Sequence, residues 1–241
     1  MVNMGKEKKI SVIIPCFNEK KTLTNLVDKV LQSFKFHGYN LYEVLIIDDF
    51  STDGSKELIE KNFSSKKNFK TFFHNKNMGK GATIKTAKKF ITGDIIIIQD
   101  ADLEYDPNDY GKLITPILNG DFKVVYGSRV LNQVRYRSIG FSSKIRIFGN
   151  HLLTLISNFL NNQKLTDAHT CYKVFDREVF DLIKLEENDF AFCPEVTSKV
   201  ANLGFEIHEV PISYNGRNYK DGKKIKTIDA LRALKTLIKY Q

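Results

Sequence analysis

The stretch Asp94-Ile-Ile-Ile-Ile-Gln-Asp-Ala-Asp-Leu-Glu104 decides the fold class of this chain. Its four consecutive isoleucines predict a short strand that is fully buried. Three acidic side chains, Asp100, Asp102 and Glu104, follow at intervals of two residues. In open α/β sheets, ligands bind at the carboxyl ends of the strands. We therefore expect a cation site at this edge, because Mg²⁺ is usually held by one or two carboxylates together with substrate phosphates.

The chain on both sides of this stretch alternates apolar strands with helices. Further strands are predicted at 10–14, 42–47, 70–73 and 123–126. Apolar side chains recur at helical spacing over 23–34 and 79–91. This alternation indicates a mostly parallel central sheet with right-handed crossovers and flanking helices. Since no linker separates two parts of the chain, we expect a single α/β domain.

The pattern becomes less regular beyond residue 128. The predicted elements are a basic loop at 129–143, an apolar-faced helix at 145–160, a helix after Pro194, a strand at 205–213 and an amphipathic helix at 226–240. Gly204 is expected to end the helix that follows Pro194, because glycine is common just past a helix end.

The charge of the chain favours an anionic partner. Its 241 residues carry a formal net charge of +9, and the sequence pI is about 9.3. A phosphorylated substrate, an anionic membrane or nucleic acid would each suit that charge. We expect no nucleic acid, because no nucleic-acid-binding motif is present and clustered carboxylates would repel phosphates without a metal.

Cysteines and hydropathy bear on where the protein works. Cys16, Cys171 and Cys193 lie far apart without a CxxC pair, which argues against a zinc site or a disulfide framework and for a reducing cytosol. Residues 1–9 are polar and charged, unlike a secretory signal. No apolar run approaches the roughly 20 residues of a membrane span. We therefore expect a cytoplasmic protein that meets lipid, if at all, from the membrane surface.

Several short motifs occur in a fixed order along the chain. They are Ser11-Val-Ile-Ile-Pro-Cys-Phe-Asn-Glu19, Ile46-Ile-Asp-Asp-Phe-Ser-Thr-Asp-Gly-Ser55, Asn77-Met-Gly-Lys-Gly-Ala82, Gln99-Asp-Ala-Asp-Leu-Glu104, Gly127-Ser-Arg129, Thr166-Asp-Ala-His-Thr-Cys-Tyr-Lys173, and Arg217 with Gly222-Lys-Lys-Ile225. The ordered set resembles family 2 glycosyltransferases of the Rossmann-like GT-A fold, in the dolichyl-phosphate mannose/glucose synthase-like branch. The resemblance covers about residues 10–240. It implies one glycosyltransferase domain over 1–241, with a nucleotide-sugar-binding half at 1–126 and an acceptor-binding half at 127–241.

The resemblance implies a donor site at the ends of the first strands, for a UDP- or GDP-sugar. The turn after the first strand would cradle the base and ribose, and one of Asp48 and Asp49 would hydrogen-bond the base. Helix capping is the alternative role of those two aspartates, but Ser51 and Asp53 suit it better. The glycines around Lys80 either contact the nucleotide or only start a helix. The donor residues implied are Pro15, Phe17, Glu19, Ile46, Asp48, Asp49, Lys80, Asp100, Ala101, Asp102, Arg217 and Lys223.

The acidic DXD-type motif is the expected metal site. The resemblance implies that Asp102 binds Mg²⁺ or Mn²⁺, with contributions from Asp100 and from Glu104, where relatives often have an amide. Such an ion would neutralise the charge that develops on the departing diphosphate. Arg217 and Lys223 would clamp the diphosphate, since arginine suits bidentate oxyanion binding and lysine acts as a point charge.

Two kinds of acceptor remain open. A hydroxyl acceptor needs a general base, for which Asp167 ranks above His169. A phosphate acceptor needs cations instead, and Arg129, Arg135 and Arg137 could supply them, Arg129 as the catalytic arginine of the Gly-Ser-Arg motif.

The leading hypothesis is therefore a metal-dependent, inverting hexosyltransferase that acts on a dolichyl or undecaprenyl phosphate. A glycan or a diacylglycerol-type lipid is the alternative acceptor. The apolar helix face at 145–160 follows a basic loop, so we expect peripheral contact with the cytoplasmic membrane face. A nucleotidyltransferase is less consistent with the sequence, because its glycine-rich basic loop would follow the first strand, where this chain has Pro-Cys-Phe-Asn-Glu.

Overall fold

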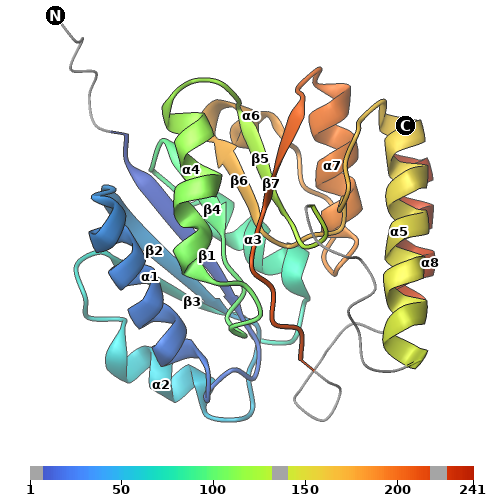
Figure 1. Cartoon of the computed structure of the whole chain (residues 1–241). Helices are drawn as coiled ribbons and strands as arrows, with labels where there is room; N and C mark the ends of the chain where they lie inside the picture. Colours follow the sequence, from blue (N-terminus) through green and yellow to red (C-terminus); the bar gives the residue numbers. More distant parts are fainter. Residues whose placement is uncertain (1–7, 132–140, 218–226) are drawn as a thin grey trace, which may run out of the picture.

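The computed structural model describes residues 8–131, 141–217 and 227–241, which form a sheet with helices on both faces (Figure 1). The seven strands are ordered β3-β2-β1-β4-β6-β5-β7. Neighbouring strands are parallel except that β6 runs antiparallel to β4 and β5. The strands are β1 (Ile10–Cys16), β2 (Leu41–Asp48), β3 (Phe69–Phe73), β4 (Ile95–Ile98), β5 (Val124–Ser128), β6 (Lys173–Asp176) and β7 (Ile207–Pro211). The predicted α/β fold with a mostly parallel sheet is confirmed.

Helices cover the two faces of the sheet and one of its sides. One face carries α1 (Leu23–His37), α2 (Ser55–Asn62), the 3₁₀ turn η1 (Pro107–Asp109) and α4 (Tyr110–Leu118). The other face carries α3 (Lys80–Lys88), α6 (Arg177–Leu182) and α7 (Phe192–Asn202). Beyond α7, the long α5 (Phe141–Asn161) and α8 (Thr227–Lys239) pack on each other and on α7 (Figure 1).

Strand β4 lies between two hydrophobic cores, which explains its composition. Ile95 and Ile97 belong to the core under α1 and α4, whereas Ile96 and Ile98 belong to the core under α3 and α7. All four side chains are fully buried. A strand covered on both faces needs an apolar residue at every position. The acidic residues begin where the strand leaves the cores, at the carboxyl edge of the sheet.

Five local differences separate the structure from the sequence-based expectations. The antiparallel β6 and the short α6 were not predicted. Helix α7 begins at Phe192, so Pro194 lies in its first turn, where the missing N–H costs no hydrogen bond. Helix α5 already begins at Phe141, which shortens the expected basic loop. Strand β7 spans Ile207–Pro211, less than the expected 205–213.

The helices of the described residues were also compared with the thickness of a membrane. In the ranges 8–131, 141–217 and 227–241, none combines the length and the hydropathy needed to cross a bilayer.

Candidate active site

The carboxyl edge of the sheet brings acidic side chains from two strands to one arginine. Glu19 follows β1, and Asp102 and Glu104 follow β4. Arg217 reaches them from the segment after β7. Its Nη1 and Nη2 donate to the Glu19 carboxylate at 3.1 and 3.0 Å, and Nη2 also donates to Asp102 Oδ2 at 2.9 Å. Its Nε lies 3.6 Å from Glu104 Oε1. One guanidinium therefore faces three carboxylates.

Within the described residues, this edge carries more negative than positive charge. Burial, together with the neighbouring Asp100 and Glu104, raises the pKa of Asp102 to about 7, although Arg217 acts in the opposite direction. Asp100 itself forms an ion pair with Lys80. Burial alone would lower the pKa of Lys80, but the charge of Asp100 raises it, so the lysine stays protonated. Arg217 therefore compensates the charge of Asp102 only in part.

The carboxylates of this edge do not form a complete cage for a metal ion. Among the residues that the structure describes, no three His, Cys, Asp or Glu side chains converge closely enough to hold one. Mg²⁺ usually takes only one or two protein carboxylates and fills its other positions with water and substrate phosphates. The unbalanced charge at Asp102 fits that arrangement, because a bound cation would relieve it.

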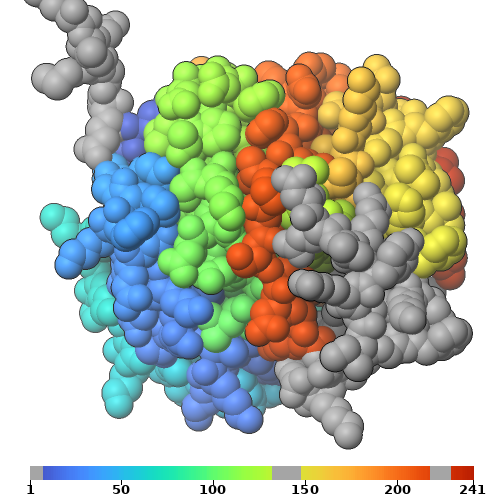
Figure 2. Space-filling model, in the orientation of Figure 1, coloured from blue at the N-terminus to red at the C-terminus, as the bar shows by residue number. Residues whose placement is uncertain are grey.

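Glu104 is held by the segment after β7. Its Oε2 accepts a hydrogen bond from Tyr214 Oη at 2.6 Å, and its Oε1 accepts one from the Arg217 backbone N–H at 2.7 Å. Its carbonyl oxygen accepts from the Asn215 N–H at 2.9 Å, and Tyr105 forms a β-bridge with Tyr214. Figure 2 shows the orange-red chain of β7 and its continuation alongside the green segment of α4. Both carboxylate oxygens of Glu104 are thus engaged.

The two aspartates at the end of β2 have different roles. Asp49 accepts hydrogen bonds from the backbone N–H groups of Met78 and Gly79 at 2.9 and 2.7 Å, so it joins β2 to the turn before α3. Asp48 Oδ2 accepts from the Ser51 N–H at 3.0 Å, while its buried Oδ1 has no hydrogen-bond partner among the described residues. Asp49 is therefore held by structural contacts through both carboxylate oxygens, whereas Asp48 keeps one oxygen without a partner among the described residues.

The glycines around Lys80 allow close packing at the start of α3. Gly79 has a φ of +94°, and a Cβ there would lie 2.5 Å from the Asn188 carbonyl oxygen. A Cβ on Gly81 would lie 2.4 Å from the Glu187 carbonyl oxygen. Both contacts are closer than real Cβ atoms make, so the turn requires glycine. The structure thus supplies a packing reason for these glycines, while Lys80 points its ammonium at the acidic edge.

The other expected donor residues lie at or below the same edge. Pro15 is the next-to-last residue of β1, and Phe17 directly follows that strand. Ile46 is fully buried within β2, and Ala101 is buried between the two aspartates of the motif. Three expected site residues fall outside the described residues: Arg135, Arg137 and Lys223.

The acceptor side of the edge contains a closed ion pair. Arg129, just after β5, donates to Asp167 Oδ2 from its backbone N–H at 3.1 Å and from Nε at 2.6 Å, and to Oδ1 from Nη2 at 2.7 Å. Asn150 Nδ2 of α5 donates to Oδ1 at 3.1 Å. Burial alone would raise the pKa of the fully buried Asp167, but Arg129 and Asn150 hold it at about 2. This carboxylate is a poor proton acceptor at neutral pH.

Two residues that sequence reasoning did not single out support this pair. Glu209 of β7 accepts from the N–H groups of Thr166 and Asp167 at 2.6 and 2.9 Å. Lys173 of β6 is fully buried and donates to the Ala168 carbonyl oxygen at 3.2 Å. In the sequence, the only sign of a special role for Lys173 was its place beside apolar residues. Nothing in the sequence indicated a role for Glu209. Burial and the charge of Lys173 lower the pKa of His169 to about 4, which leaves it neutral.

Comparison with protein families matches the sequence of this chain to one of them. The model described as glycosyl transferase family 2 matches residues 11–183, which include both aspartates of the DXD-type motif and the Arg129–Asp167 pair. The match extends over more than half of the chain.

Individual proteins give a consistent result. The chain is 30% identical over 223 residues to the UDP-N-acetylglucosamine–dolichyl-phosphate N-acetylglucosaminyltransferase of Methanococcus voltae, covering 86% of this chain and 85% of that protein. It is 27% identical over 240 residues to the dolichyl-phosphate beta-glucosyltransferase ALG5A of Trichomonas vaginalis, covering 95% and 72%. Glucosyl-3-phosphoglycerate synthase from Mycobacterium tuberculosis, in complex with Mn²⁺ and UDP-glucose, aligns with a TM-score of 0.71 at 16% identity, covering 97% and 79%. At that identity, the structural likeness is evidence for the fold alone.

Proposed function

The chain belongs to glycosyltransferase family 2, and within that family we propose that it transfers a hexose, with inversion, from a nucleoside-diphosphate sugar to a polyprenyl phosphate. The names of two relatives, from Methanococcus voltae and Trichomonas vaginalis, specify dolichyl phosphate. We assign donor binding to residues 1–126 and acceptor binding to 127–241, with Arg217 returning to the donor side.

The Arg129–Asp167 pair is the observation that favours a phosphate acceptor. A hydroxyl acceptor needs a general base, whose pKa should lie near the working pH. Asp167 has a pKa of about 2, and His169 one of about 4, so neither meets that need. A phosphate acceptor is already anionic and needs a cation to hold it. Arg129 donates to Asp167 from Nε and Nη2, so Nη1 is the guanidinium nitrogen that would donate to the acceptor phosphate.

On the donor side, each remaining polar group has a proposed partner. The buried Asp48 Oδ1, which has no hydrogen-bond partner among the described residues, would accept from a uracil or guanine N–H. Arg217 would bind the diphosphate in place of some of its present carboxylate contacts. Asp102, with Asp100 beside it, would hold Mg²⁺ or Mn²⁺, which supplies Lewis-acid stabilisation of the departing diphosphate when bound. Lys80 holds Asp100 in place through their ion pair.

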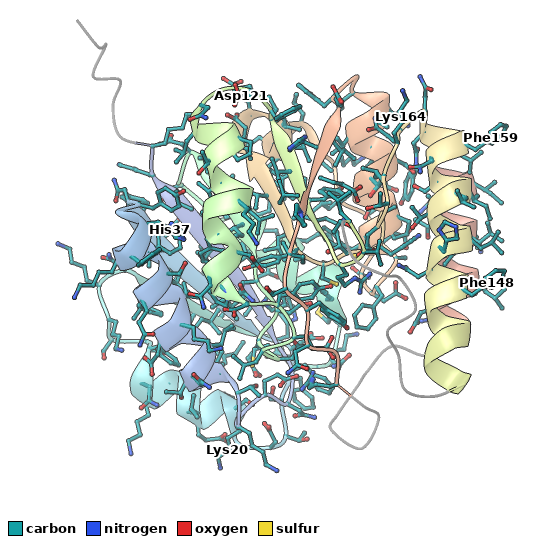
Figure 3. The ribbon with its side chains drawn as sticks, in the orientation of Figure 1. Lys20, His37, Asp121, Phe148, Phe159 and Lys164 are labelled. Atoms are coloured by element: carbon teal, nitrogen blue, oxygen red, sulfur yellow. The ribbon has the colours of Figure 1, made fainter. Side chains whose placement is uncertain are left out.

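The exposed face of α5 is the proposed membrane contact. Phe148, Leu152, Leu155 and Phe159 recur along one side of the helix and are 60%, 48%, 51% and 87% exposed. Phe148 and Phe159 point away from the body of the protein (Figure 3). Helix α5 contains no acidic residue, which suits an anionic lipid surface. We place this face against the cytoplasmic leaflet that carries the acceptor.

Flotation with anionic liposomes at low salt tests the membrane contact. The protein should float with the liposomes, and the double variant Phe148→Ser/Phe159→Ser should float about tenfold less. Phe36→Ser is the matched control, because Phe36 is 85% exposed on α1 instead of α5. Equal flotation of both variants, or none of the wild type, would rule the contact out.

A panel of UDP- and GDP-sugars tests the reaction itself. Each sugar nucleotide is supplied with Mn²⁺ or Mg²⁺, with and without a polyprenyl phosphate, and nucleoside diphosphate release is measured. Release should require the polyprenyl phosphate. Release with a glycan or a diacylglycerol, but not with the phosphate, would overturn the proposed acceptor class.

A further inference from the structure

Residues 214–217, which we call the strap, connect the donor side of the site to the acceptor side. Its last residue, Arg217, binds Glu19 and Asp102 on the donor side. Its first residue, Tyr214, lies under the Arg129 guanidinium, with the Arg129 Cζ 5.2 Å from the ring centroid. The two arginines proposed to bind the two substrates are therefore joined through four residues of chain.

Glu104 is the residue that fixes this strap. It accepts hydrogen bonds from the Tyr214 hydroxyl, the Asn215 N–H and the Arg217 N–H, at 2.6, 2.9 and 2.7 Å. Tyr105, next in the chain, packs on Tyr214 with ring centroids 5.2 Å apart. Burial raises the pKa of Tyr214, so its hydroxyl remains a donor to the carboxylate. The side-chain contacts of Glu104 lie at the strap, while its backbone N–H donates to Asp102 Oδ1 at 3.0 Å. Within the described residues, no third metal-binding side chain converges with Asp100 and Asp102.

We infer that Glu104 anchors the strap instead of binding the metal ion, and that Tyr214 is a positioning residue that couples the donor arginine to the acceptor arginine. The inference rests on the proposed function. A diphosphate that engages Arg217 would act on the same short segment that supports Arg129. Nucleotide binding would then change how well the acceptor phosphate is held, without any direct contact between the two substrates.

Metal affinity separates an anchor from a ligand at position 104. Free Mn²⁺ is measured by electron paramagnetic resonance in the presence of UDP or GDP, for Glu104→Gln and Asp102→Asn. The amide oxygen of glutamine can still accept from the strap, so we expect Glu104→Gln to change Mn²⁺ affinity by less than about threefold and Asp102→Asn to lower it at least about tenfold. Glu178→Gln is the control, because Glu178 is a surface partner of Lys123.

Two outcomes of that experiment have different meanings. If Glu104→Gln loses Mn²⁺ affinity as severely as Asp102→Asn, Glu104 is a metal ligand and the inference is wrong. If the wild-type protein shows no Mn²⁺-dependent binding of either nucleotide, the proposed function fails instead.

Tyr214→Phe tests the coupling. It removes the hydroxyl that binds Glu104 but keeps the ring under Arg129. We expect KM for a short-chain polyprenyl phosphate to rise about tenfold, the effect of losing one hydrogen bond to a charged group, while nucleotide affinity stays within about threefold. Tyr39→Phe is the matched control, since the Tyr39 hydroxyl forms a hydrogen bond with Thr115 and the residue lies just before the start of β2, at the opposite edge of the sheet. An unchanged acceptor KM in Tyr214→Phe would overturn the coupling.

Discussion

The two arginines at the carboxyl edge of the sheet are held in opposite ways. Arg129 faces one fully buried carboxylate, Asp167, and binds both of its oxygens. Arg217 contacts Glu19 and Asp102 by hydrogen bonds and approaches Glu104 as well. Among the described residues, Arg129 is therefore paired with a single carboxylate, whereas Arg217 faces three. This difference teaches that an arginine closed onto one carboxylate is held in place, whereas an arginine shared among three carboxylates leaves negative charge that a bound cation would relieve.

The largest expected effect comes from the donor side. Asp102→Ala should lower nucleoside diphosphate release by about a thousandfold or more, about 4 kcal/mol of transition-state stabilisation, because the departing diphosphate loses its metal. Steady-state release with Mn²⁺ or Mg²⁺ is the measurement, and the surface variant Asp121→Ala is the control. Full activity of Asp102→Ala, or of the wild type in the presence of a chelator, would contradict the proposal that Asp102 holds a metal ion.

The free energy of unfolding should respond in the reverse order, with a larger loss in Asp167→Ala than in Asp102→Ala. Asp167→Ala leaves the Arg129 guanidinium buried without its partner, which costs about 3 kcal/mol or more of unfolding free energy. Asp102→Ala removes one of several crowded carboxylates, so its cost should stay below about 1 kcal/mol. Urea denaturation of both variants measures the difference. Equal losses would mean that the two arginine sites do not differ in charge balance.

The pH dependence of stability gives a smaller effect on the acceptor side. The pKa of Asp167 falls from its ordinary 3.8 to about 2 in the folded protein. Its stabilising contribution is therefore complete above about pH 4 and is lost as the pH falls towards 2, a loss on the order of 2 kcal/mol. Denaturation at several acid pH values should show that the free energy of unfolding falls less steeply with decreasing pH in Asp167→Asn than in the wild type. Parallel curves would show that Arg129 does not hold this carboxylate ionised.

The fold could be predicted from sequence wherever the signal was local. Four isoleucines in β4 identify a strand covered on both faces, and acidic residues directly after it identify the edge. Strand β6 was missed because its residues, Lys173 to Asp176, are few and begin and end with a charged side chain. They are extended because they fit between β4 and β5, and such tertiary context overrides local preference.

Most of the described candidate residues lie at one edge of the sheet, but their contacts there could not be read from the sequence. Which donors reach a carboxylate depends on parts of the chain that are distant in sequence. Asp49 is engaged by N–H groups about thirty residues away, and Glu104 by the strap more than a hundred residues away. The sequence left Asp167 open as a base or as a residue that orients the acceptor, and it gave no sign that Arg129 binds this carboxylate. Residue type predicts that a carboxylate matters, but the folded chain decides whether it is free to react.

The smallest expected effect concerns the shape of the donor arginine. Arg217→Lys keeps the positive charge but loses the planar fork that binds Glu19 through two nitrogens. UDP or GDP should bind about tenfold more weakly, close to 1.4 kcal/mol, because a diphosphate loses the same bidentate geometry. Calorimetric titration with Mn²⁺ present measures this, and Arg232→Lys on α8 is the control, since Arg232 pairs with Asp189 at the surface. Unchanged nucleotide affinity would mean that Arg217 acts only as a charge, and the donor side would then need no arginine at all.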